Sequence, residues 1–123
     1  MSKIRPEELD ERRSRGDDLV ILDVRPREDY QAGHIDGSQN APVYRDLAKG
    51  DTEALEAHLD EIPTGAEVVT VCKKGVVARK ATSYLSERGR EAATLAGGMW
   101  GWRQYENGTL LYRLSSWVRN FLG

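Results

Sequence analysis

The amino-acid sequence predicts an α/β domain in which helices cover both sides of a mainly parallel sheet. Residues 19–24 ("LVILDV") and 67–72 ("EVVTVC") are short, continuous apolar runs, which are typical of strands buried on both faces. Segments with helical spacing of apolar residues lie between such runs, and this alternation favours a parallel sheet. The length of 123 residues, with 39% hydrophobic and 31% charged residues, fits one globular domain.

Five segments are predicted as strands. In chain order they are an edge strand at residues 2–4, the apolar run at 19–24, a short strand at 38–43, the apolar run at 67–72 and a weaker candidate at 91–97.

Three segments between these strands are predicted as helices. Residues 5–16 have Pro6 in the first turn and Gly16 as a stop signal. Residues 51–63 place Leu55, Leu59 and Ile62 on one helical face. Residues 76–89 likewise place Val77, Ala81, Tyr84 and Leu85 on one face.

The end of the chain predicts a separate amphipathic helix. Residues 1–106 form the α/β domain in this interpretation, and residues 107–123 form an extension with a break at Gly108 and an N-cap at Thr109. Its apolar stripe consists of Leu110, Leu111, Leu114, Trp117, Val118, Phe121 and Leu122. We expect this stripe to pack on the domain itself, on a second copy in a homodimer through residues 110–122, or on a partner protein.

Composition excludes several classes of protein. A net charge of −2 gives no electrostatic case for nucleic acid. No stretch has the length and apolar character of a transmembrane or leader segment, so we expect no membrane contact. A single cysteine precludes an internal disulfide and favours a reducing, cytoplasmic location. One cysteine with His34 and His58 cannot supply about four metal ligands, and we expect no metal and no cofactor.

The single cysteine stands where an α/β domain places its chemistry. Cys72 ends a predicted buried strand and precedes a helix, and ligands bind outside the carboxyl ends of parallel strands. Gly75 permits a turn that directs backbone N–H groups at the sulfur, and the helix N-terminus adds a positive dipole end. These groups and the ammonium groups of Lys73 and Lys74 favour a thiolate and a second anion beside it. The implied chemistry is attack by the thiolate on an anionic donor.

Other thiol chemistries lack a required partner. Dithiol exchange needs a second cysteine, which the chain does not have. A cysteine hydrolase needs a histidine base, but His58 flanks an acidic helix, and His34 lies in a turn-rich stretch that favours a structural hydrogen-bonding role. Sulfur transfer to a thiolate needs no general base.

Three separated motifs resemble the rhodanese domain family over about residues 3 to 106. They are "LDVRPREDYQAGHIDGSQNAP" (22–42), "VVTVCKKGVVA" (68–78) and "LAGGMWGW" (95–102). The resemblance implies a five-stranded domain whose loop cysteine, Cys72, accepts a sulfane sulfur as a persulfide and passes it to cyanide or a thiol, including a protein thiol. It also implies that Asp23 and Arg25 brace the loop. We expect Trp100 and Trp102 to be packing residues rather than substrate contacts, with a place in the pocket wall as the alternative for one of them.

The active-site loop resembles that of the thiosulfate-using members. Lys73, Lys74, Gly75 and Val76 match their pattern, whereas Val77 stands where they have threonine or arginine. We expect residues 73–77 to bind a small anionic sulfur donor. Arg79 is expected to be a solvated surface residue. The function expected is a thiosulfate sulfurtransferase, and the alternative is a non-catalytic or relay module that binds a partner protein.

Overall fold

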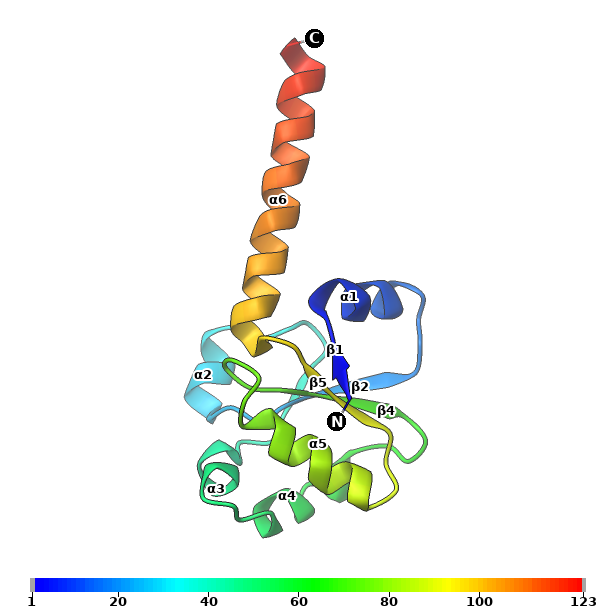
Figure 1. The fold of residues 1–123 in the computed structure, drawn as a ribbon, viewed down its shortest axis with the longest axis vertical. Coiled ribbons are helices and arrows are strands. Elements are labelled where there is room, and N and C mark those ends of the chain that lie inside the picture. Colours follow the sequence, from blue (N-terminus) through cyan, green and yellow to red (C-terminus); the bar gives the residue numbers. More distant parts are fainter. Residues whose placement is uncertain (1, 123) are drawn as a thin grey trace.

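Five parallel strands form one sheet in the order β1-β5-β4-β2-β3, shown in the computed structural model in Figure 1. The structure describes residues 2–122, with the side chains of 111–113, 115–117 and 119–122 outside the description. All five predicted strands are present. Their bounds are β1 Lys3–Ile4, β2 Leu19–Asp23, β3 Gln39–Asn40, β4 Glu67–Val71 and β5 Ala92–Leu95.

Helices cover both faces of this sheet (Figure 1). The helices α1 (Pro6–Ser14) and α6 (Gly98–Leu122) lie on one side. On the other side lie α3 (Tyr44–Ala48), α4 (Glu53–Glu56) and α5 (Ala78–Glu87). A short helix α2 (Arg27–Ala32) follows β2, and a 3₁₀ turn η1 (Leu59–Glu61) follows α4.

Two apolar clusters fill the space between the sheet and its helices. In β4, Val69 and Val71 face the α1 and α6 side, whereas Val68 and the following Cys72 face the side of α5. This alternation follows from the period of two along a strand. Because both faces are buried, β4 reads as a continuous apolar run, and the sulfur of Cys72 emerges on the α5 side.

Two helical predictions need correction. The helix expected over residues 51–63 is divided into α4 and η1, although Leu55 and Ile62 are both buried as expected. Pro63 holds the residue before it, Ile62, in an extended conformation, which ends the turn there. Helices α2 and α3 were not predicted, because both are short. Helix α2 buries none of its side chains and α3 buries only Leu47, so no apolar period marks either helix in the sequence.

The predicted break at Gly108 is wrong. Helix α6 continues without interruption from Gly98 to Leu122, because one glycine costs a helix only about 1 kcal/mol. Figure 1 shows its second half standing clear of the sheet, and Leu110, Leu114 and Val118 are 43–56% exposed. The other members of the expected stripe lie outside the described side chains, so its packing on the domain or a partner stays a prediction.

The first half of α6 is anchored to the domain. Met99 and Trp102 are buried in the cluster on the α1 side. The Tyr105 hydroxyl donates a hydrogen bond to Asp10 Oδ2 of α1 at 2.7 Å, and this bond raises the pKa of Tyr105. In the part of the chain that the structure describes, no helix combines the length and apolar character needed to cross a membrane.

Candidate active site

Backbone N–H groups converge on the sulfur of Cys72, directly after β4. The N–H of Gly75 lies 3.1 Å from Sγ and the N–H of Ala78 lies 3.3 Å from it, and both donate to the sulfur. Ala78 is the first residue of α5, so its N–H belongs to the positive end of that helix. Such donors can hydrogen-bond to negative charge that develops on the sulfur during a reaction. The prediction that this turn directs N–H groups at Cys72 is confirmed.

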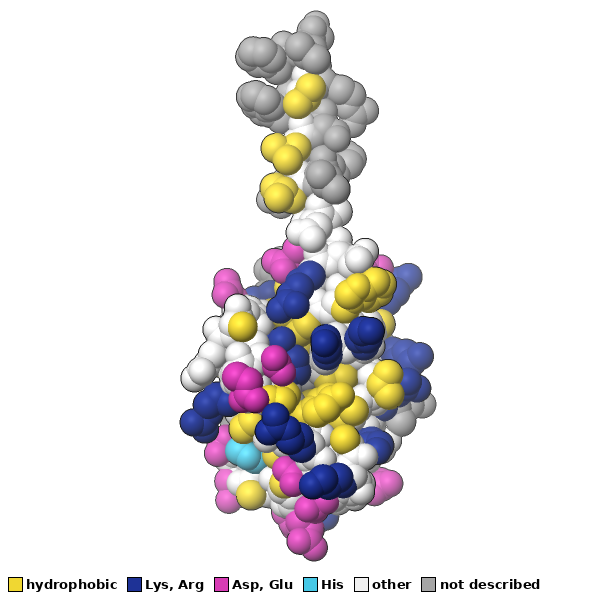
Figure 2. Space-filling model, turned by 90° about the vertical axis from the view of Figure 1, so that its left-hand side faces the viewer, with side chains coloured by type: hydrophobic (Ala, Val, Ile, Leu, Met, Phe, Trp, Pro, Cys, Tyr) yellow, Lys and Arg dark blue, Asp and Glu magenta, His cyan; other side chains and the backbone are white. Residues whose placement is uncertain are grey.

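Cys72 lies at the bottom of a small pocket. The residue is only 1% exposed, and the pocket above it has a volume of about 260 Å³. Its walls are Tyr44, Lys73, Lys74, Val76 and Val77. Both lysines are exposed. On the side of the molecule seen in Figure 2, Lys and Arg side chains, together with some Asp and Glu, border exposed apolar side chains. A reactant therefore meets cations before it reaches the sulfur.

The backbone of this loop rests on the first turn of α6. The N–H groups of Met99 and Trp100 donate to the carbonyl oxygens of Cys72 and Lys73 at 2.9 and 3.0 Å. Gly98 has a positive φ of 55°, and a Cβ there would overlap the carbonyl oxygen of Cys72 and lie 2.8 Å from the nitrogen of Gly75. Only glycine permits this approach of the two backbones.

A row of buried threonine hydroxyls lies below the loop. Thr70 Oγ1 of β4 donates to the carbonyl oxygen of Ala78 at 3.1 Å. It also bonds Thr82 Oγ1 at 2.8 Å, and Thr82 Oγ1 bonds Thr94 Oγ1 of β5 at 2.7 Å. These bonds tie the start of α5 to two strands and so hold the N–H of Ala78 in place.

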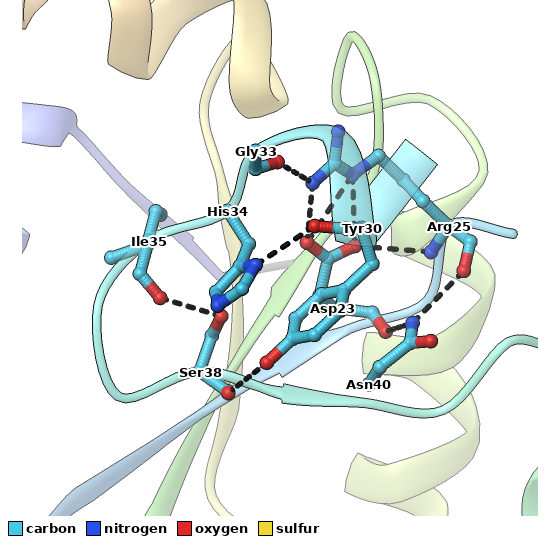
Figure 3. A network of polar contacts seen from close by, with 8 residues as sticks. All are labelled: Asp23, Arg25, Tyr30, Gly33, His34, Ile35, Ser38 and Asn40. Atoms are coloured by element: carbon cyan, nitrogen blue, oxygen red, sulfur yellow. Dashed lines mark hydrogen bonds and ion pairs between the residues drawn. The ribbon is translucent and has the colours of Figure 1, made fainter. Parts of the chain in front are cut away.

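Asp23 and Arg25 form a buried ion pair at the neighbouring strand end (Figure 3). Arg25 Nη2 lies 2.8 Å from Asp23 Oδ2, and the two side chains are 5% and 1% exposed. The same Nη2 donates to the carbonyl oxygen of Gly33 at 2.7 Å. Asn40 Nδ2 of β3 donates to the carbonyl oxygens of both Asp23 and Arg25. The pair thus fixes the path of the chain from β2 to β3.

The expected bracing of the Cys72 loop by Asp23 and Arg25 is therefore indirect. Among the described residues, the hydrogen bonds of their side chains go to residues 23–33 and not to residues 72–77. The connection to the loop runs through the sheet, where the N–H of Val24 donates to the carbonyl oxygen of Val71 at 2.9 Å. Direct support of the loop comes instead from Gly98, Met99 and Trp100.

The remaining candidates follow the expected pattern in part. His34 stacks on Tyr30 and its Nδ1 donates to the Tyr30 carbonyl oxygen at 2.8 Å, which confirms a structural role (Figure 3). Arg79 is exposed, as expected. Trp102 packs in the core, whereas Trp100 is 57% exposed and only its backbone N–H supports the loop.

Two residues of the site were missed from the sequence. Tyr44, the first residue of α3, lines the pocket. Because sites in parallel sheets gather at the carboxyl ends of the strands, the segment after β3, which includes Tyr44, was a candidate. Gly98 belongs to the motif at residues 95–102. Its contact with Cys72 joins two residues that are 26 positions apart, and no local sequence pattern indicates such a contact.

Comparison with known proteins assigns this arrangement to a class. Several solved structures share the fold of this chain. One is a rhodanese-like domain protein from Staphylococcus aureus, with a TM-score of 0.70 and 25% identity, over 83% of this chain and 91% of that one. The family model described as Rhodanese-like domain matches residues 5–105, and the chain belongs to this family.

Curated relatives include sulfurtransferases and larger proteins. The chain is 33% identical to thiosulfate sulfurtransferase GlpE of Pseudoalteromonas translucida, over 70% of this chain and 74% of the relative. It is 36% identical to the HTH-type transcriptional regulator Rv0324 of Mycobacterium tuberculosis and 33% identical to adenylyltransferase and sulfurtransferase MOCS3-2 of Zea mays, over 75% and 72% of this chain. It spans only 38% and 18% of those two relatives.

The contact between Gly98 and the cysteine loop predicts that any side chain at position 98 destabilises the fold. We expect Gly98→Ala to lower the free energy of unfolding by about 2–4 kcal/mol, because it combines backbone strain with overlap. The matched control Gly89→Ala also has a positive φ but meets nothing within 4 Å. It should cost only about 1–2 kcal/mol. Equal urea-unfolding midpoints for the two variants would show that the backbone contact is unimportant.

The buried pair predicts that Arg25 matters more than an exposed arginine. Arg25→Ala leaves the Asp23 carboxylate buried without a counter-ion and should cost about 3–5 kcal/mol of unfolding free energy. Arg45→Ala removes an exposed pair with Glu28 and should cost less than about 1 kcal/mol. Urea denaturation of both variants measures the difference, and a cost for Arg25→Ala no greater than that for Arg45→Ala contradicts the role assigned to the pair.

Proposed function

We propose that this domain is a sulfurtransferase that moves a sulfane sulfur from thiosulfate, or a similar anionic donor, to cyanide or a thiol. The observation that carries the proposal is the pair of N–H groups, from Gly75 and Ala78, at the sulfur of Cys72. A buried structural cysteine needs no such donors, whereas a sulfur that bears negative charge before and after transfer does.

The reaction has two balanced steps. In the first, the Cys72 thiolate attacks the outer sulfur of thiosulfate, the bond between the two sulfurs of thiosulfate breaks, and sulfite leaves with the electron pair. The product is a Cys72 persulfide anion. In the second, cyanide or a thiolate attacks the outer sulfur of this persulfide, and the Cys72 thiolate leaves. Neither step needs a proton, a metal or an external oxidant.

The chain's own residues divide these tasks. The N–H groups of Gly75 and Ala78 stabilise the anionic sulfur, and the start of α5 adds its dipole. Lys73 and Lys74 stand at the rim, where they attract a dianionic donor and stabilise departing sulfite. The pocket of about 260 Å³ suits a small anion rather than a bulky one. Val76 and Val77 form part of the wall along which the donor enters, and Gly75 contributes its backbone N–H.

The relatives support the class of reaction. GlpE of Pseudoalteromonas translucida is a thiosulfate sulfurtransferase by name and aligns with most of this chain. The maize relative is an adenylyltransferase and sulfurtransferase of which this chain covers a minor part. A free thiolate that accepts sulfur must stay reduced, which fits a cytoplasmic location. The alternative, a module that binds a partner without turnover, gives no use to the donors at Sγ.

The mechanism predicts that all turnover depends on Cys72. Cys72→Ala should abolish thiocyanate formation from thiosulfate and cyanide while the thermal unfolding midpoint stays within a few degrees, because the chain has no other thiol to hold the persulfide. Mass spectrometry of the unaltered protein with thiosulfate should show a gain of one sulfur atom that cyanide reverses. Thiocyanate release by Cys72→Ala, or no gain of sulfur by the unaltered protein, contradicts the proposal.

The rim lysines predict a salt-dependent loss of donor use. Because both are exposed, replacing Lys73 and Lys74 together by alanine should lower kcat/KM for thiosulfate by about tenfold at low ionic strength, and by less at high salt. A double variant of Lys3 and Arg5 to alanine removes the same charge at the far edge of the sheet and serves as the control. Equal effects of the two double variants would mean that net charge alone matters.

A further inference from the structure

A second, larger groove adjoins the pocket of Cys72. It has a volume of about 610 Å³, and Val76 lines both hollows, so the two lie side by side. One wall is formed by α5 and the residues just before it, and the other by Gly50 and Thr52. Val76 is 60% exposed and presents an apolar side chain at the junction. The reaction proposed above makes no use of this groove.

The groove has the length of a short extended peptide. Along α5 it is lined from Val76 to Glu87, a separation of 11 positions that corresponds to about 16 Å of helix. A peptide in extended conformation covers this distance with about five residues, at 3.3 Å each. A thiosulfate or cyanide ion fills only a small fraction of such a groove.

The charges of the lining residues favour an acidic occupant near the Cys72 end. Arg79 and Lys80 line the groove, and neither forms an ion pair with any residue that the structure describes. Their only side-chain partners there are the backbone carbonyl oxygens of Gly75 and Ala48, which leave the positive charge uncompensated. The lining residues of the facing wall, Gly50 and Thr52, are uncharged, although Asp51 stands between them in the chain, and the carboxylate that the lining includes, Glu87, lies at the far end.

The burial of Cys72 favours an extended segment over a folded surface. A residue that is 1% exposed cannot be touched by a flat protein face. An acceptor group on an extended chain can enter the small pocket while the residues beside it lie over Val76 and along α5. The groove then aligns the acceptor with the sulfur.

We propose that this groove docks an extended acidic peptide of a protein that accepts sulfur from Cys72. This inference rests on the proposed function, since it names the class of acceptor. The acceptor thiolate attacks the outer sulfur of the Cys72 persulfide, the Cys72 thiolate leaves, and a persulfide anion forms on the peptide. Acidic residues next to the acceptor lie over Arg79 and Lys80, and an uncharged or basic residue lies near Glu87.

The test measures sulfur transfer to synthetic peptides. The probes are five-residue peptides with blocked ends, a cysteine at one end or the other, and two internal glutamates. In matched probes two lysines replace the glutamates. The Cys72 persulfide is formed with thiosulfate, and transfer to each peptide is followed by mass spectrometry. At low ionic strength, we expect kcat/KM to be about fivefold higher for the better acidic probe than for its lysine counterpart.

Variants of the groove locate the effect. Lys80→Glu should lower kcat/KM for the acidic probe by about fivefold and leave thiosulfate–cyanide turnover unchanged. Ser83→Trp should lower transfer to all peptides, because Ser83 lines the groove and the indole fills it. Lys3→Glu, with the same charge change in β1 at the far edge of the sheet, is the control and should have no effect.

The outcomes separate the two proposals. If no persulfide forms with thiosulfate, the proposed function fails before any peptide is added. If the persulfide forms and cyanide accepts its sulfur, but acidic and basic probes react equally or Lys80→Glu and Ser83→Trp change nothing, the groove is not a docking site. An equal loss with Lys3→Glu also overturns the inference, because the effect is then one of net charge.

Discussion

The close approach of two backbone segments determines the geometry of this site. The loop after β4 and the Gly97–Gly98 turn before α6 meet without intervening side chains, and the first N–H groups of α6 donate to the loop carbonyl oxygens. Gly75 has a φ of +87°, and a Cβ there would lie 3.2 Å from the nitrogen of Gly97. The N–H of Gly75 points at the sulfur because its peptide is held in this conformation. The position of one reactive atom thus depends on a turn about 25 residues further along the chain.

Charge at the site is distributed between backbone and side chains. The buried sulfur receives N–H groups rather than a buried cation, which avoids the cost of removing an ammonium group from water. The lysines stay exposed at the rim, where their interactions are weaker but extend to an approaching anion. The buried ion pair of Asp23 with Arg25 holds the path between β2 and β3. Arg25 donates to one backbone carbonyl oxygen of this path, and Asn40 donates to two others. The charges proposed to act on the donor are therefore kept apart from the charges that hold the fold.

Local patterns predicted the strands, because burial on both faces makes β2 and β4 continuous apolar runs. They also predicted the position of Cys72, because the turn with Gly75 comes directly after β4 in the sequence. The same reasoning failed where structure depends on distant contacts. Gly108 has the sequence character of a break, yet the helix passes through it because its first half is held by Met99, Trp102 and Tyr105. The sequence led us to expect that Arg25 braces the loop but did not show how. Its hydrogen bond to Gly33 depends on how α2 folds back, and α2 has no apolar period to reveal it.

The burial of Cys72 has consequences for selectivity. A persulfide on an exposed thiol would react with any thiol in solution, whereas one at the bottom of a pocket reacts only with groups narrow enough to enter. Small anions meet this condition without further recognition, so the rim charges suffice for them. When a protein acceptor binds, the segment that enters the pocket loses conformational entropy. Contacts beyond the pocket are needed to offset this loss. In the proposed docking, the groove along α5, which shares Val76 with the pocket, provides such contacts. Under these proposals, the chemistry at the sulfur depends on residues 72–78 and the choice of acceptor on the outer face of α5, so each can vary separately.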